Sequence, residues 1–173
     1  MATKTPVFGI TPKAEQAAST AAGSSKIQGI NPKTGNPYHF ESDLYTPITW
    51  KGSTTLRNGR TYDISRRVYQ RNDIDWKSSQ FRDKYGRTNL DRVKDGDPPL
   101  SSDGQSIQLH HVIGKEPGAM AEIPRSVHQK YSKQLHGIIE KSFRRNPTLN
   151  EMYNNYRQQY WRWRAEQVER KLK

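Results

Sequence analysis

Four of the five histidines lie in a short segment whose pattern predicts two strands followed by a helix. Residues 107–112 and 119–123 are apolar, β-branched runs of strand length, and a helix is predicted from an N-cap at Ser126 to about Gly137. The first strand and the helix carry the histidines: His110, His111, His128 and His136. The chain has no cysteine and no glycine-rich phosphate loop. The imidazoles are therefore the main candidates for chemistry, and they suggest a divalent metal with a histidine base beside it.

The strong positive charge limits the partners. A net charge of +12 on 173 residues, with a pI near 10.0, predicts a polyanionic ligand. Nucleic acid is the first expectation and an anionic membrane surface the second. No apolar run approaches the roughly 18 residues that a membrane span needs, and the first residues lack the apolar core of a signal peptide. We therefore expect a soluble chain without membrane insertion.

Composition also predicts the domain organisation. Only 31% of the residues are hydrophobic, so part of the chain is expected to lie outside any core. Residues 1–43 are rich in Ala, Ser, Thr, Gly and Pro and are predicted to be a flexible linker. Residues 44–173 are predicted to form one domain, in which 48–50 and 62–64 pair as a hairpin around Asn58-Gly59. No obligate oligomer is expected.

A second helix is predicted over residues 147–172, with Asn146 as its cap and Pro147 in its first turn. An apolar stripe should face the core: Leu149, Met152, Tyr153, Tyr156, Tyr160 and Trp163. Basic side chains on other faces should meet water or phosphate: Arg157, Arg162, Arg164, Arg170 and Lys171. Residues 104–173 hold 13 lysines and arginines against 6 acidic residues. The predicted nucleic-acid contacts are Lys115, Arg125, Lys130, Arg144, Arg145, Arg162 and Trp161, the last by stacking on a base.

Several spaced motifs together resemble nucleases of the HNH/endonuclease VII superfamily that are named for a Leu-His-His motif. The motifs are Leu109-His110-His111, Ala121-Glu122-Ile123-Pro124, His128 with Leu135-His136-Gly137, and Tyr160-Trp161-Arg162-Trp163-Arg164. The resemblance covers roughly residues 62–166. It implies an α+β fold with a ββα-metal (His-Me finger) core at about 105–140 and additional helices, to which the composition of residues 1–43 adds a disordered N-terminal tail. It also implies a C-terminal toxin module of a bacterial polymorphic toxin, which is translocated into the cytoplasm of a target cell and neutralised by an immunity protein.

The resemblance implies that His110 binds the metal and that His111 activates water. A strict strand would send these two side chains to opposite faces, so we expect the strand to end or twist there, with Gly114 permitting the bend. In one straight helix, His128 and His136 would be about 12 Å apart along the axis and about 80° apart around it. We therefore expect His110 and one helical histidine to bind the metal, with His128 ranked above His136. Water and phosphate oxygens should complete the coordination shell. Glu122 is a spare ligand or an orienter of an imidazole.

Two classes of function follow. The first is a metal-dependent endonuclease that cuts DNA without sequence preference, using Zn, Mg, Mn or Ni. The alternatives are an RNA-cleaving toxin and a non-catalytic basic domain with a structural zinc. The feature that separates them is His111, because a structural zinc site has no need of an extra imidazole beside a ligand. Roles unrelated to catalysis stay open for individual residues. His136 is equally well explained as a structural histidine, and the basic side chains are equally well explained as solvated surface charges.

Overall fold

A computed structural model describes residue 40 and residues 43–78, 81–112, 115–130 and 143–173. The elements of these residues are β1 (Tyr45–Trp50), β2 (Ser53–Thr55), β3 (Thr61–Asp63), β4 (Arg66–Arg71), α2 (Asn89–Lys94), β5 (Ile107–His111), β6 (Met120–Pro124), α3 (Arg125–Lys130), the 3-10 helix η4 (Phe143–Arg145) and α5 (Pro147–Leu172). They form an α+β fold, as predicted. Within the described part of the chain, no helix is both long enough and apolar enough to span a bilayer.

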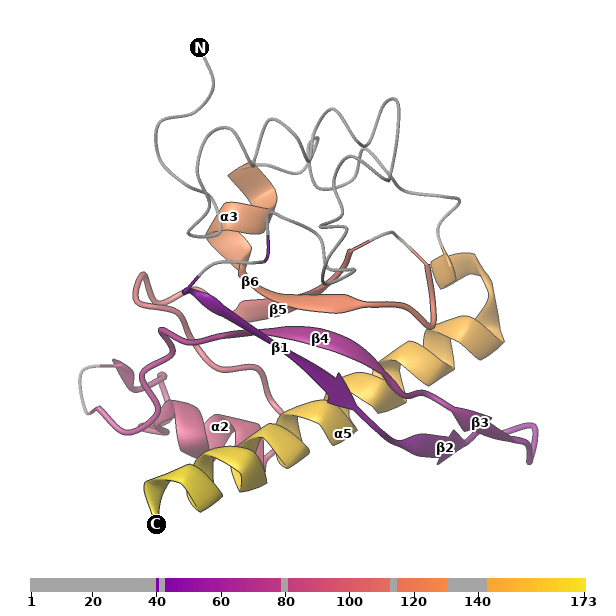
Figure 1. The fold of residues 1–173 in the computed structure, drawn as a ribbon, viewed down its shortest axis with the longest axis horizontal. Helices are drawn as coiled ribbons and strands as arrows, with labels where there is room; N and C mark the ends of the chain where they lie inside the picture. The colour runs from indigo at the N-terminus through magenta and orange to yellow at the C-terminus, as the bar shows by residue number, and fades with distance from the viewer. Residues whose placement is uncertain (1–39, 41–42, 79–80, 113–114, 131–142) are drawn as a thin grey trace.

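One mixed sheet lies between two sets of helices. Its strand order is β1-β4-β6-β5, with β4 parallel to β6 and the other neighbours antiparallel. Figure 1 shows α5 running along one face of this sheet and α3 on the other side. The larger core cluster joins the sheet to α5, and a smaller one, which includes Phe40, Tyr69 and Ile123, fills the opposite face. The strands β4 and β6 are almost entirely buried because both of their faces are covered.

Helix α5 begins where the sequence predicts. The Asn146 side chain accepts a hydrogen bond from the backbone N–H of Leu149, and Pro147 occupies the first turn. The predicted stripe is confirmed: four of its members are fully buried, and Leu149 and Trp163 are partly buried against the same core. Two expectations on this helix are wrong. Arg164 is buried in an ion pair with Glu122, and Trp161 is only 2% exposed.

The predicted hairpin between residues 48–50 and 62–64 is wrong in its pairing. Ile48 in β1 lies opposite Val68 in β4, while β2 pairs with β3 over Ser53–Thr55 and Thr61–Asp63. The turn itself is where the sequence places it, because Gly59 has φ +77°, a conformation that glycine adopts without strain. The chain therefore forms two strand pairs here, the short hairpin of β2 with β3 and the longer pair of β1 with β4, where the sequence pattern predicted a single pair.

The segment that carries the histidines has the predicted order of strand, strand and helix. β5 and β6 pair antiparallel, and α3 follows β6 without a loop. The helix starts at Arg125, so the predicted N-cap at Ser126 is wrong, and the Ser126 hydroxyl instead donates a hydrogen bond to Asp103. The predicted continuation to Gly137 lies outside the described residues. Of the predicted linker over 1–43, Phe40 is described and is fully buried, so packing reaches back at least to that residue.

Candidate active site

His110 and His111 point to opposite sides of the sheet. The register sets His110 opposite Ala121 and His111 opposite Met120, and side chains alternate along a strand. β5 ends at His111, as expected, but no twist brings the pair to one face. Both side chains nevertheless line one groove of about 710 Å³, which runs along β5, the edge strand of the sheet. The groove is thus bordered by two different histidine environments.

The first environment is a pair of imidazoles. Because α3 follows β6 directly, it brings Nε2 of His128 to 3.2 Å from Nδ1 of His110. Two ligands that each lie about 2.1 Å from one ion are roughly 3.0–3.4 Å apart in octahedral or tetrahedral geometry. The two nitrogens are at hydrogen-bond distance, and their separation also falls in that range, so the pair is compatible with a shared divalent ion.

A buried oxygen on the same face supports this fit. Gln108 precedes His110 by two residues in β5, so the two side chains share a face, and both line the groove. The Oε1 atom of Gln108 is buried and accepts no hydrogen bond from any residue that the structure describes. Within the described ranges, no group of three or more His, Asp or Glu side chains could hold a metal. His136, the other predicted ligand, lies outside those ranges.

Glu122 does not serve the histidines, and that expectation is wrong. Its side chain faces α5, where its carboxylate accepts hydrogen bonds from Tyr160 Oη at 2.5 Å and Arg164 Nε at 3.0 Å. The backbone N–H of Arg71 donates to the same carboxylate at 2.7 Å. The carboxylate is fully buried and enclosed by these donors. Its role is to join the sheet to α5.

The second environment is a chain of three charged or polar side chains. Nε2 of His111 lies 2.6 Å from Oε2 of Glu116, and Arg66 donates to both oxygens of that carboxylate at 2.8 and 2.7 Å. Burial by itself raises the pKa of Glu116, but the hydrogen bonds from His111 and Arg66 and the charge of Arg66 lower it below its ordinary value. Because an ionised carboxylate only accepts hydrogen bonds, Nε2 of His111 carries the proton. This leaves Nδ1 as the acceptor of a neutral imidazole.

Aromatic rings and arginines surround His111 on the groove side. The centres of the Phe143 and Tyr153 rings lie 4.7 and 4.8 Å from the centre of the His111 ring. The guanidiniums of Arg144 and Arg157 lie 4.9 and 5.2 Å from the centre of the Tyr153 ring. All five side chains line the groove. Two positive charges are thus held beside an imidazole that can accept a proton.

The predicted nucleic-acid contacts divide into groups. Arg144 lines the groove; Lys115, Arg125, Arg145 and Arg162 are exposed and are not among its lining residues. The side chain of Lys130 lies outside the described part. Trp161 lines the groove but is buried edge-to-face against Tyr160, so its expected stacking on a base is wrong. The sequence did not single out Arg66, Gln108 or Glu116 for a role at the site. The local signal for Glu116 is its position in Glu116-Pro117, shortly after Leu109-His110-His111.

Comparison with known families identifies the matched segment. Residues 88–167 match the model of a nuclease of the HNH/ENDO VII superfamily with conserved LHH. The match begins at the N-cap of α2 and runs through β5, β6 and α3 into α5, and Leu109-His110-His111 is the one Leu-His-His of this chain. No solved structure matches the chain.

Proposed function

Because residues 88–167 match the model of a nuclease of the HNH/ENDO VII superfamily with conserved LHH, we propose that this protein is a metal-dependent endonuclease that hydrolyses DNA without sequence preference. One observation carries the proposal. His111, held by Glu116, and the pair of His110 with His128 line the same groove. A base and a metal-binding pair beside one cavity are the parts that hydrolysis of a phosphodiester requires.

In the proposed site, His110 and His128 would hold one divalent ion as the ligands of a ββα-metal core, with His136 as a further candidate. Such an ion supplies positive charge to the phosphate in the transition state and to the leaving oxygen. Gln108 contributes a carbonyl oxygen on the same face, which suits a hard ion or a water bound to it. The imidazoles suit Zn and Ni, whereas the Gln108 oxygen together with water and phosphate oxygens suits Mg and Mn, so the ion would be one of these four.

His111 acts as the general base in this proposal. Its Nδ1 accepts a proton from the attacking water, and the imidazolium that forms keeps its Nε2–H on Glu116. The negative charge of Glu116 stabilises that imidazolium and fixes the tautomer of the neutral ring. Arg66 keeps the Glu116 carboxylate ionised and in place through two hydrogen bonds. A structural zinc site would have no use for this chain of contacts.

Arg144 and Arg157 bind the phosphates of the substrate. Their guanidiniums lie over the Tyr153 ring at the groove, beside His111. Contacts with phosphates carry no information about base sequence, so a nuclease that relies on them cuts many sequences. The net charge of +12 supports the same reading, because it attracts any polyanionic strand.

The biological role that we propose is that of an antibacterial toxin domain. As the resemblance implies, the domain would be translocated from one bacterium into the cytoplasm of another and neutralised in the producer by an immunity protein. A strongly basic protein favours an acidic inhibitor that covers its phosphate-binding side chains. Synthesis of the chain without such an inhibitor should stop bacterial growth and degrade the chromosome.

Incubation with plasmid DNA and, separately, with RNA tests the activity. Cleavage of plasmid in the presence of Mg²⁺, Mn²⁺, Ni²⁺ or Zn²⁺, and its loss with EDTA, is the expected result. His111→Ala should be inactive, while His39→Ala, a histidine outside the predicted core, serves as the matched control. Cleavage of RNA alone would change the substrate, and cleavage that survives EDTA would overturn the metal dependence.

A further inference from the structure

An exposed aromatic ring stands on a tight turn just before helix α2. Among the described residues, the large hydrophobic side chains on the surface are Tyr85 and Leu172, and Tyr85 is 72% exposed. Lys84 Nζ lies 4.9 Å from the centre of the Tyr85 ring, and the guanidinium of Arg87 lies 5.7 Å from it. We refer to residues 82–86 as the tyrosine turn. An exposed ring with cations beside it is a combination that binds unpaired bases and their phosphates.

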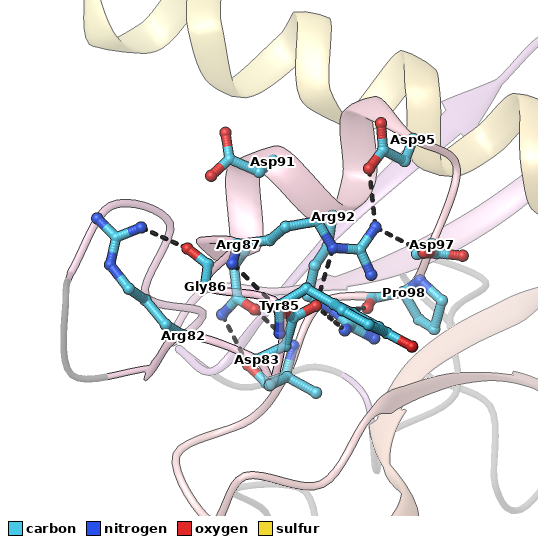
Figure 2. A network of polar contacts seen from close by, with 12 residues as sticks. Arg82, Asp83, Tyr85, Gly86, Arg87, Asp91, Arg92, Asp95, Asp97 and Pro98 are labelled. Atoms are coloured by element: carbon cyan, nitrogen blue, oxygen red, sulfur yellow. Dashed lines mark hydrogen bonds and ion pairs between the residues drawn. The ribbon is translucent and has the colours of Figure 1, made fainter.

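One carboxylate braces the tyrosine turn. Asp83 accepts hydrogen bonds from the backbone N–H of Tyr85 at 2.9 Å and of Arg87 at 3.0 Å. The guanidiniums of Arg87 and Arg92 donate to it at 2.9 and 2.8 Å (Figure 2). Burial by itself raises the pKa of Asp83, but the hydrogen bonds from Arg87, Tyr85 and Arg92 lower it well below its ordinary value. The ring therefore stands on a preorganised backbone, which reduces the entropy lost on binding.

The same two arginines connect the tyrosine turn to the groove. Arg87 donates to the Asp97 carboxylate at 2.9 Å, and Arg92 Nε donates to the carbonyl of Pro98 at 2.8 Å. Asp97 and Pro98 line the groove that also contains the histidines. Because Arg87 lies against the Tyr85 ring and donates to Asp97, the turn lies beside residues that line the groove; Figure 2 shows Tyr85, Arg87, Asp97 and Pro98 together. A strand that leaves the groove past Asp97 would meet the ring.

The charge of the tyrosine turn suits a polyanion. Asp83 pairs with Arg87 and Arg92, and Arg87 also pairs with Asp95 and Asp97, so two guanidiniums are shared among three carboxylates outside the exposed side of the turn. The exposed charged side chains of the turn are then Arg82 and Lys84, both positive. Arg82 also donates to the carbonyl of Gly86 at 2.5 Å, which holds its guanidinium on the turn.

We propose that the tyrosine turn binds the nucleic-acid strand whose phosphodiester occupies the groove. Tyr85 stacks on an unpaired base, and Arg82 and Lys84 contact the phosphates beside that base. This inference rests on the proposed function and extends it, because it makes a single-stranded segment the preferred substrate. Every base has a π face, so the contact adds affinity without adding a sequence preference.

The test uses the full chain and two kinds of substrate. Single-stranded oligonucleotides of increasing length report on the groove and the turn together, whereas bis(p-nitrophenyl) phosphate reports on the groove alone. Tyr85→Ala should raise KM about 5- to 100-fold for the longer oligonucleotides and leave hydrolysis of the small diester unchanged. Tyr85→Phe should behave like the wild type. Leu172→Ala, at the other exposed hydrophobic position, is the matched control and should also behave like the wild type.

Each outcome separates this inference from the proposed function. A wild-type protein that hydrolyses neither substrate would overturn the proposed function itself. A wild-type protein that cleaves oligonucleotides, together with a Tyr85→Ala variant of unchanged KM at every length, would overturn the tyrosine turn alone. Loss of small-diester hydrolysis in Tyr85→Ala would also overturn it, because the ring would then support the fold of the groove and not bind the strand.

Discussion

Arg66 and Glu116 form a two-pronged ion pair across 50 residues of sequence, with N···O separations of 2.7 and 2.8 Å. Both side chains are buried, and the same carboxylate lies 2.6 Å from Nε2 of His111. Arg66 precedes the segment 88–167 that matches the nuclease family. His111, which lies in the matched segment, is thus held through Glu116 by Arg66 of β4, a strand outside that segment. Substitution of Glu116 measures what the ion pair contributes.

Glu116→Gln should reduce kcat about 10- to 100-fold and leave KM nearly unchanged. The amide still accepts the Nε2–H of His111, but it no longer stabilises the imidazolium that forms in the reaction. Steady-state kinetics on a defined oligonucleotide would measure this, and Glu116→Asp should recover part of kcat. An unchanged kcat in a folded Glu116→Gln protein would show that the carboxylate only supports the structure.

The Glu116 carboxylate should also make stability depend on pH in the acid range. Its pKa is lower in the folded protein than its ordinary value of 4.5, so the unfolded chain binds the proton first. The stabilisation is complete above that ordinary value and is lost as pH falls through the lower pKa of the folded state. Relative to Glu116→Gln, the wild type should be more stable by about 3 kcal/mol at neutral pH. Urea unfolding should show that this difference shrinks below about pH 4.5. A difference independent of pH would contradict the prediction.

His111→Ala should lower the rate of cleavage by about two to four orders of magnitude and retain metal binding. The imidazole of His111 contacts Glu116 and lies on the face of the sheet opposite the pair of His110 and His128. Single-turnover kinetics and metal titration on the same preparation would separate the two effects. Near wild-type cleavage in this variant would exclude His111 as the base.

His110→Ala and His128→Ala should each weaken metal affinity by at least about tenfold, with His136→Ala intermediate. The reason is the separation of 3.2 Å between the ring nitrogens of His110 and His128, which suits one shared ion. Isothermal titration calorimetry with Mn²⁺ and Zn²⁺ would measure the affinities, and His39→Ala is the control. Unchanged affinity in His128→Ala with complete loss in His136→Ala would reverse the order of the helical ligands.

Arg144→Ala and Arg157→Ala should weaken DNA binding more than Arg125→Ala and Arg145→Ala do. All four side chains are exposed, but the first two line the groove and the second two are not among its lining residues. Each lost phosphate contact should reduce the slope of log K against log salt by about one, and equally for unrelated sequences. Fluorescence anisotropy at several salt concentrations would measure this slope. Equal effects of all four substitutions, or a strong sequence preference, would contradict the prediction.

Local patterns predicted the elements around the site well. The Asn146-Pro147 start of α5, its buried stripe and the strand-strand-helix order all follow from short-range chemistry: capping, periodicity and turn residues. Errors arose where partners come from distant parts of the chain. Arg164 was expected to face solvent, but Glu122 compensates its burial from another element.

The amino-acid sequence by itself determined which residues are the candidates for the chemistry and on which elements they lie: Leu-His-His at the end of a strand, a histidine on the following helix, and an excess of positive charge. Only the tertiary structure decided how these residues are paired. Alternation along β5 separates His110 from His111, antiparallel pairing with β6 brings His128 to His110, and β4 supplies Arg66 to Glu116. These contacts join residues 18 and 50 positions apart. Periodicity and turn chemistry act over a few residues, so they cannot specify contacts that depend on strand order and packing.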